Sequence, residues 1–179
     1  MRYFVFALAT LGMMIRTATS LAVPPPINEI AAPTAGTGPV EIATGADGNL
    51  WFTQQSGNKI GQVTPSGTVT QFAIPTAGSD PVGITAGPDG NLWFTESTAN
   101  KIGRITVAGV ITEFPIPTAA SAPTSIAKGP DGFLWFTEFS ADKIGRMSTT
   151  GGVAEFTLPL GRGPFHITTG PDGNLWFTE

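Results

Sequence analysis

The chain has 179 residues, of which 12% are charged, and a formal net charge of −4. This weakly acidic balance argues against nucleic-acid binding, because no basic patch could neutralise phosphates. The absence of cysteine excludes disulfides, zinc–thiolate sites and a cysteine nucleophile. The 23 glycines and 16 prolines, with 41% hydrophobic residues, favour short strands joined by tight turns.

Residues 1–22 have the features of a secretory signal peptide. Arg2 supplies a positive start, and residues 3–15 are apolar or neutral. Small residues around Ala22 suit cleavage by a signal peptidase. The apolar run is too short to cross a bilayer core of about 30 Å as a helix. The sequence therefore predicts export to the periplasm or the medium, without stable membrane insertion after cleavage.

Residues 27–34 resemble the end of a repeat that recurs later in the chain. Their sequence, Ile-Asn-Glu-Ile-Ala-Ala-Pro-Thr, matches residues 111–118, Ile-Thr-Glu-Phe-Pro-Ile-Pro-Thr. We expect an orphan outer strand here, since the strands that should precede it in a repeat are missing. In a closed ring of repeats, such a strand completes the last unit.

Residues 23–179, the predicted mature chain, form an incomplete propeller organised by a repeat of about 42 residues. Leu-Trp-Phe-Thr occurs at 50–53, 92–95, 134–137 and 175–178. A proline opens each unit at the same spacing, as Pro39, Pro81, Pro123 and Pro164. Several short strands in each repeat of 40–50 residues are typical of a β-propeller blade. The predicted units are full blades at 38–80, 81–122 and 123–163, followed by a half blade at 164–179.

The unit at 81–122 divides into four predicted strands, at 83–86, 91–95, 101–106 and 110–116. Asp89-Gly90 predicts a two-residue hairpin turn. Consecutive apolar residues in the second strand predict burial on both faces, so its Trp and Phe are interpreted as packing between blades. Pro115 indicates that the fourth strand is an edge strand. The Asn-Lys or Asp-Lys pairs at 58–59, 100–101 and 142–143 are interpreted as loop features.

The predicted fold class is therefore all-β, an incomplete propeller of four-stranded antiparallel blades. A ring closes with four to eight blades. If the complete ring has seven, this chain covers about half of it and is the front part of a longer protein. We expect the complete ring to be a monomer.

Two phrases carry a resemblance to a known family. Gly-Pro-Asp-Gly-Asn-Leu-Trp-Phe-Thr-Glu at 87–96 and Asn-Lys-Ile-Gly-Arg-Ile-Thr at 100–106 are similar to the repeats of streptogramin lyases, the virginiamycin B lyase family. The similarity covers residues 27–179. It implies a carbon–oxygen lyase that linearises cyclic type B streptogramins, which are cyclic depsipeptides, by elimination. It further implies a histidine base and a magnesium ion that polarises the ester carbonyl.

The family's acidic positions are only partly present in this chain. The glutamate that ends the Trp-Phe strand occurs in three of the four units, and the residue before the unit-opening proline is acidic in one. The resemblance makes these the candidate magnesium ligands: Asp80, Glu96, Glu138 and Glu179. The first unit has Gln54 in place of the strand-ending glutamate.

The family's catalytic histidine follows the unit-opening proline, and none of the four units has it there. The residues at that position are Val40, Val82, Thr124 and Phe165. His166, the single histidine, lies one place further on, aligned with Gly83. Because neighbouring strand residues face opposite sides, His166 is not expected to project as the family's base does. It is the one catalytic candidate in the chain, and the family's full set is expected in later blades.

Two other functions remain open on the sequence. The absence of histidine after each proline fits a non-catalytic exported propeller that binds a polysaccharide, a peptide or another cell-envelope ligand. A lactonase-like propeller with a central divalent ion would need several acidic or amide side chains in the channel. The first strands, rich in Ile, Thr and Ala, do not supply them.

Overall fold

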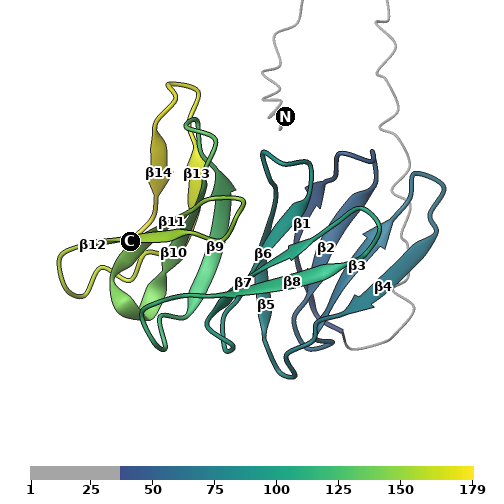
Figure 1. Cartoon of the computed structure of the whole chain (residues 1–179), viewed down its shortest axis with the longest axis horizontal. Helices are drawn as coiled ribbons and strands as arrows, with labels where there is room; N and C mark the ends of the chain where they lie inside the picture. Colours follow the sequence, from purple (N-terminus) through teal and green to yellow (C-terminus); the bar gives the residue numbers. More distant parts are fainter. Residues whose placement is uncertain (1–36) are drawn as a thin grey trace, which may run out of the picture.

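The computed structural model describes residues 37–179, so the predicted signal peptide at 1–22 and orphan strand at 27–34 lie outside the described residues. The described chain forms three four-stranded antiparallel sheets and a two-stranded hairpin. Figure 1 shows the three sheets side by side in chain order, with the hairpin at the far end from the first sheet. The prediction of an all-β fold built from four-stranded propeller blades is confirmed.

Each blade is a meander of short strands. The first blade contains β1 (Pro39–Thr44), β2 (Leu50–Gln54), β3 (Lys59–Val63) and β4 (Val69–Ala73). The second contains β5 (Pro81–Ala86), β6 (Leu92–Glu96), β7 (Lys101–Ile105) and β8 (Ile111–Pro115). The third contains β9 (Pro123–Lys128), β10 (Leu134–Glu138), β11 (Lys143–Met147) and β12 (Val153–Thr157), and β13 (Ile167–Thr169) pairs with β14 (Leu175–Phe177).

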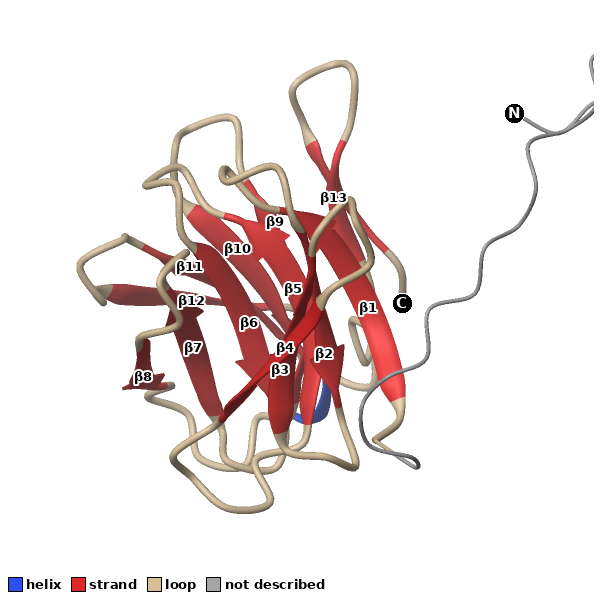
Figure 2. Ribbon diagram, turned by 90° about the vertical axis from the view of Figure 1, so that its right-hand side faces the viewer, coloured by secondary structure: helices blue, strands red, loops and turns tan. Residues whose placement is uncertain are grey.

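One short helical turn, η1 (Phe139–Ala141), interrupts this all-strand arrangement in the third blade (Figure 2). No helix within residues 37–179 is long and apolar enough to cross a membrane. The first strands of successive blades contact one another, β1 with β5, β5 with β9 and β9 with β13. They therefore surround a common axis, while β4, β8 and β12 form the outer edges. Pro115 lies on one of these edge strands, as predicted.

The aromatic repeat packs adjacent blades together. Trp51 and Phe94 lie in one fully buried cluster formed by the first two blades, and Trp93 and Phe136 lie in the next cluster. All five residues of β6 are buried, which confirms the prediction for this strand. Trp176, in the last hairpin, is 60% exposed because no described strand follows it.

A glycine in the third strand makes room for the phenylalanine of the second. Gly103 pairs directly with Phe94, and the Phe94 ring lies where a Cβ of residue 103 would be. Gly61 and Gly145 have the same relation to Phe52 and Phe136. The phenylalanine ring that packs over this position therefore explains why each Lys-Ile-Gly motif ends in glycine.

The predicted two-residue turn at Asp89-Gly90 is wrong, because the loop has three residues. The N–H of Gly87 donates to the Asn91 carbonyl at 2.8 Å, and the N–H of Gly90 donates to the Gly87 carbonyl. Gly90 has a φ of 78°, which fits a type I turn followed by a left-handed glycine. Asp89 stabilises this longer loop by accepting hydrogen bonds from the Asn91 N–H and the Trp93 Nε1.

Candidate functional site

A repeated threonine joins each blade to the next where the first strands begin. Thr95 Oγ1 accepts a hydrogen bond from the Gly83 N–H at 2.8 Å and donates one to the Thr124 carbonyl of the next blade. The register of β5 with β6 shifts between Pro81 and Ile84, which leaves the Gly83 N–H outside the regular ladder. The same relay occurs through Thr53, from Glu41 to Val82, and through Thr137, from Ser125 to Phe165.

This relay brings the residues that follow the four unit-opening prolines to one level around the axis. They line a cavity of about 190 Å³ at the mouth of the channel. Its lining residues are Val40, Glu41, Val82, Thr124, Phe165 and His166. The mouth thus has mainly apolar walls with one carboxyl group and one imidazole.

Glu41 is a site residue that the sequence analysis missed. Its Oε2 accepts a hydrogen bond from the Ile84 N–H of the second blade at 3.1 Å. Burial raises the pKa of Glu41 above its usual value, although the Ile84 hydrogen bond and the nearby His166 oppose the increase. Gly83 leaves room for this carboxylate, since a Cβ there would lie 3.2 Å from Glu41 Oε2. The available signal was its alignment with Gly83, Ser125 and His166, which makes it the acidic member of that position.

His166, the catalytic candidate, lies at the same mouth. Its side chain is exposed, and its backbone N–H donates a hydrogen bond to Thr178 Oγ1 at 3.1 Å. Both Phe165 and His166 line the cavity, although neighbours in a regular strand face opposite sides. Strict alternation does not apply here because both residues precede β13.

The strand-ending glutamates lie between the blades and not at the mouth. Glu96 and Glu138 are fully buried, and no carboxyl oxygen of either has a hydrogen bond of good geometry. Burial, followed by the charge of Glu113, raises the pKa of Glu96 to about 8. Burial, followed by the charge of Glu155, raises the pKa of Glu138 to about 7. Carboxyl groups that favour the protonated form are poor ligands for a hard divalent cation.

The other two metal candidates have separate surroundings. Glu179 forms an ion pair with Arg162 at 3.1 Å. Asp80 adopts a positive φ of 58°, and its carbonyl accepts a hydrogen bond from the Ser97 N–H. No group of three or more His, Cys, Asp or Glu residues within 37–179 is arranged to hold a metal ion. The structure therefore does not bring the four candidates together, and they do not fit a magnesium site.

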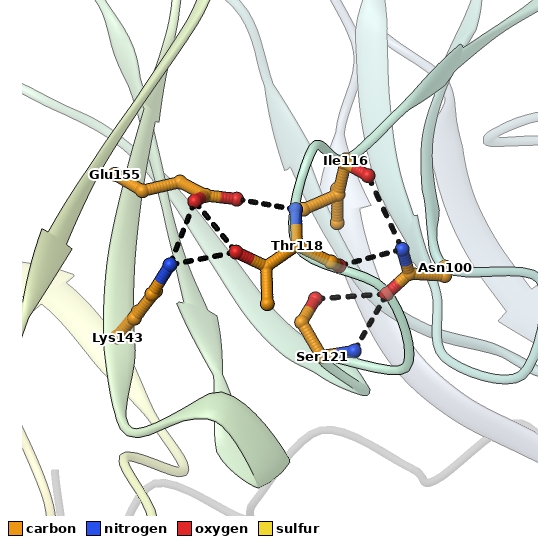
Figure 3. A network of polar contacts seen from close by, with 6 residues as sticks. All are labelled: Asn100, Ile116, Thr118, Ser121, Lys143 and Glu155. Carbon is orange, nitrogen blue, oxygen red and sulfur yellow. Dashed lines mark hydrogen bonds and ion pairs between the residues drawn. The ribbon is translucent and has the colours of Figure 1, made fainter.

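The Asn-Lys pairs, interpreted from the sequence as loop features, also organise the contact between blades. In Figure 3, Asn100 Nδ2 donates to the carbonyls of Ile116 and Thr118, and Asn100 Oδ1 accepts from the N–H and hydroxyl of Ser121. The Thr118 hydroxyl donates to Glu155 of the third blade at 2.7 Å. Lys143 completes the network, 2.9 Å from Glu155. Asn100 thus holds the loop that docks onto the next blade.

In the third repeat, an aspartate occupies the position of this asparagine and holds the corresponding loop. Asp142 cannot donate, and its carboxylate instead accepts hydrogen bonds from the backbone N–H groups of Gly161, Arg162 and Gly163. These bonds lower the pKa of Asp142. The tryptophan spacing is one residue shorter across this loop, at 41 from Trp135 to Trp176. The shorter loop turns N–H groups toward position 142, and this favours aspartate over asparagine.

Comparisons with known proteins agree with this geometry. A model described as the virginiamycin B lyase family matches residues 19–179. A streptogramin B lyase structure is 45% identical with a TM-score of 0.82, over 85% of this chain and 51% of that chain. Selenomethionine-substituted virginiamycin B lyase from Staphylococcus aureus is 42% identical with a TM-score of 0.80, over 83% and 51%.

A third solved structure is a catalytically inactive histidine-to-alanine variant of the Staphylococcus aureus enzyme with quinupristin. It is 47% identical to this chain with a TM-score of 0.80, over 83% of this chain and 51% of that chain. The chain thus spans about half the length of these solved relatives.

Proposed function

Because the chain belongs to the virginiamycin B lyase family, we propose that it is part of a carbon–oxygen lyase that linearises cyclic type B streptogramins by elimination. The observation that carries this proposal is the family match over residues 19–179. The relative that is inactive after a histidine-to-alanine change, and whose structure contains quinupristin, supports both a histidine-dependent reaction and a ligand of this class.

The half propeller contributes the channel mouth to this reaction, and not its base. Val40, Val82, Thr124 and Phe165 occupy the positions where the family resemblance would put the histidine. The base would therefore come from the part of the propeller outside the matched half. Magnesium would polarise the ester carbonyl if bound, and its ligands would also come from outside residues 37–179.

The proposal predicts a specific product from the complete reading frame. Incubation with quinupristin should give a linear product of unchanged mass, because elimination opens the ester without adding water. Liquid chromatography with mass spectrometry distinguishes this product from the cyclic antibiotic, and EDTA should stop its formation. Heat-inactivated protein is the control. A product heavier by one water would show hydrolysis and contradict the proposed reaction.

One observation favours a second function, a non-catalytic binding propeller. None of the four described post-proline positions is a histidine. On this alternative, the complete protein leaves quinupristin cyclic but sediments with insoluble cell-wall polysaccharide. Turnover of the antibiotic without such sedimentation would reject it.

We also propose that the protein is exported, on the composition of residues 1–22. Expression in a bacterial host should give a periplasmic or secreted protein whose intact mass corresponds to cleavage after Ala22. An uncleaved protein confined to the cytoplasm would contradict export.

A further inference from the structure

The cavity at the channel mouth contains two ionisable groups that do not contact each other. Glu41 and His166 both line its 190 Å³. No hydrogen bond joins Glu41 to His166. The ion pairs among residues 37–179 all involve other side chains. A ligand group can therefore lie between the carboxylate and the imidazole.

The carboxylate of Glu41 has more hydrogen-bond acceptors than the contact between blades requires. Ser125, at the same position of the third repeat, accepts the equivalent hydrogen bond from the Ile167 N–H with a neutral hydroxyl. The bond from Ile84 occupies Glu41 Oε2 and orients the carboxylate. Glu41 Oε1 has no hydrogen-bond donor within residues 37–179. The repeat thus shows that a hydroxyl suffices for the structural bond, which leaves the second carboxylate oxygen for another use.

The rest of the cavity favours an apolar ligand body. Val40 is 50% exposed and Phe165 is 49% exposed, so both offer uncovered apolar surface. Val82 adds a further apolar wall, and no lysine or arginine lines the cavity. A partly buried carboxylate among apolar side chains is stabilised by a cation, and the face of an aromatic ring also attracts one.

We propose that this cavity binds a small organic ammonium ligand with an apolar body. The ammonium group donates to Glu41 Oε1, the body packs on Val40 and Phe165, and His166 lies at the side of the bound ligand. The cavity is the channel mouth that the proposed lyase would also use, but ammonium binding there involves only residues of this chain and can be measured without turnover of the antibiotic.

The single histidine of the chain provides a direct probe. In the complete protein labelled at histidine, His166→Gln identifies the imidazole Cε1–H signal of His166 by removing it. Benzylammonium should shift this signal in a saturable manner. Benzyl alcohol and benzoate have the same apolar body without the positive charge, and they should shift it much less at equal concentration.

Glu41→Gln tests the charge while keeping an oxygen that can accept the Ile84 hydrogen bond. It should weaken benzylammonium binding at least about tenfold, because a hydrogen bond to a charged group typically contributes that much. Asp131→Asn makes the same charge change in the loop between β9 and β10 and should leave the affinity unchanged. Equal shifts with benzyl alcohol, or equal affinity in Glu41→Gln, would overturn the proposal. The comparison with benzoate remains decisive on the native chain if that variant does not fold.

Discussion

Glu96→Gln is expected to stabilise the protein at alkaline pH, by up to about 5 kcal/mol in the free energy of unfolding above pH 8. Burial raises the pKa of Glu96 from 4.5 to about 8 in the folded protein. The folded state therefore holds this proton more tightly than the unfolded state. Its stabilising effect is complete below pH 4.5 and is lost as the pH rises toward 8. A glutamine has no proton to lose, so the variant should not show this decline.

Urea unfolding at pH 5 and pH 9 measures the effect, because the midpoint changes with stability when the slope is constant. The first blade shows that an amide fits here, since Gln54 is fully buried at the equivalent position. Glu138→Gln should behave similarly with a smaller gain, as burial raises the pKa of Glu138 only to about 7.

Glu113→Gln is the matched control in the same interface. Burial acts to raise the pKa of Glu113, but hydrogen bonds, among them those from Thr76 and Lys101, lower it below its usual value, and Glu113 forms an ion pair with Lys101 at 3.3 Å. Its stabilising effect is therefore present above pH 4.5 and lost at lower pH. This substitution should destabilise the protein at neutral pH, opposite to Glu96→Gln. Parallel pH profiles for wild type and Glu96→Gln would contradict the assignment.

Gly103→Ala is expected to destabilise the protein by about 1–3 kcal/mol or more, because an overpacked core must shift to accept the added carbon. The methyl group would overlap the Phe94 ring, which is fully buried between two blades and has little freedom to move. Thermal unfolding followed by tryptophan fluorescence measures the loss.

Gly152→Ala is the control for this substitution. Gly152 lies in the turn before β12, and an added Cβ there would meet Ser148 Oγ at 3.3 Å and no backbone atom within 4 Å. It should change stability by less than about 0.5 kcal/mol, as surface substitutions usually do. The double variant Gly103→Ala, Phe94→Leu should be more stable than the sum of the single effects predicts, since the smaller side chain relieves the overlap. Equal losses at positions 103 and 152 would contradict the packing argument.

The blade architecture could be predicted because its cause lies within one repeat. Each blade must bury two faces, so Trp93 and Phe94 stand side by side in a strand without alternation. The metal candidates could not be placed by the same reasoning. Equivalent positions in successive repeats are related by rotation about the axis, and this rotation puts Glu96 and Glu138 in different interfaces. Repetition in the sequence therefore separates such residues unless they point at the axis.

Glu41 was missed for the converse reason. Glu41 and His166 are 125 positions apart and belong to different repeats, and only the common level of the first strands brings them to one cavity. The three-residue loop was missed because Asp89 binds the Trp93 indole, a contact that local turn preferences do not contain.

The threonine relay has a consequence for how such a ring can change. Thr95 accepts from a backbone N–H of its own blade and donates to a backbone carbonyl of the next, and Thr53 does the same. Val82, Thr124 and Phe165, which follow opening prolines, accept these bonds through their backbone carbonyls. The Thr124 hydroxyl adds side-chain hydrogen bonds to Thr137 Oγ1 and to the Phe165 carbonyl. The four units use valine, valine, threonine and phenylalanine at this position. The backbone part of this connection therefore does not depend on the side chain at these positions. New ligand specificities can arise at the mouth by single substitutions that leave these backbone bonds between blades in place.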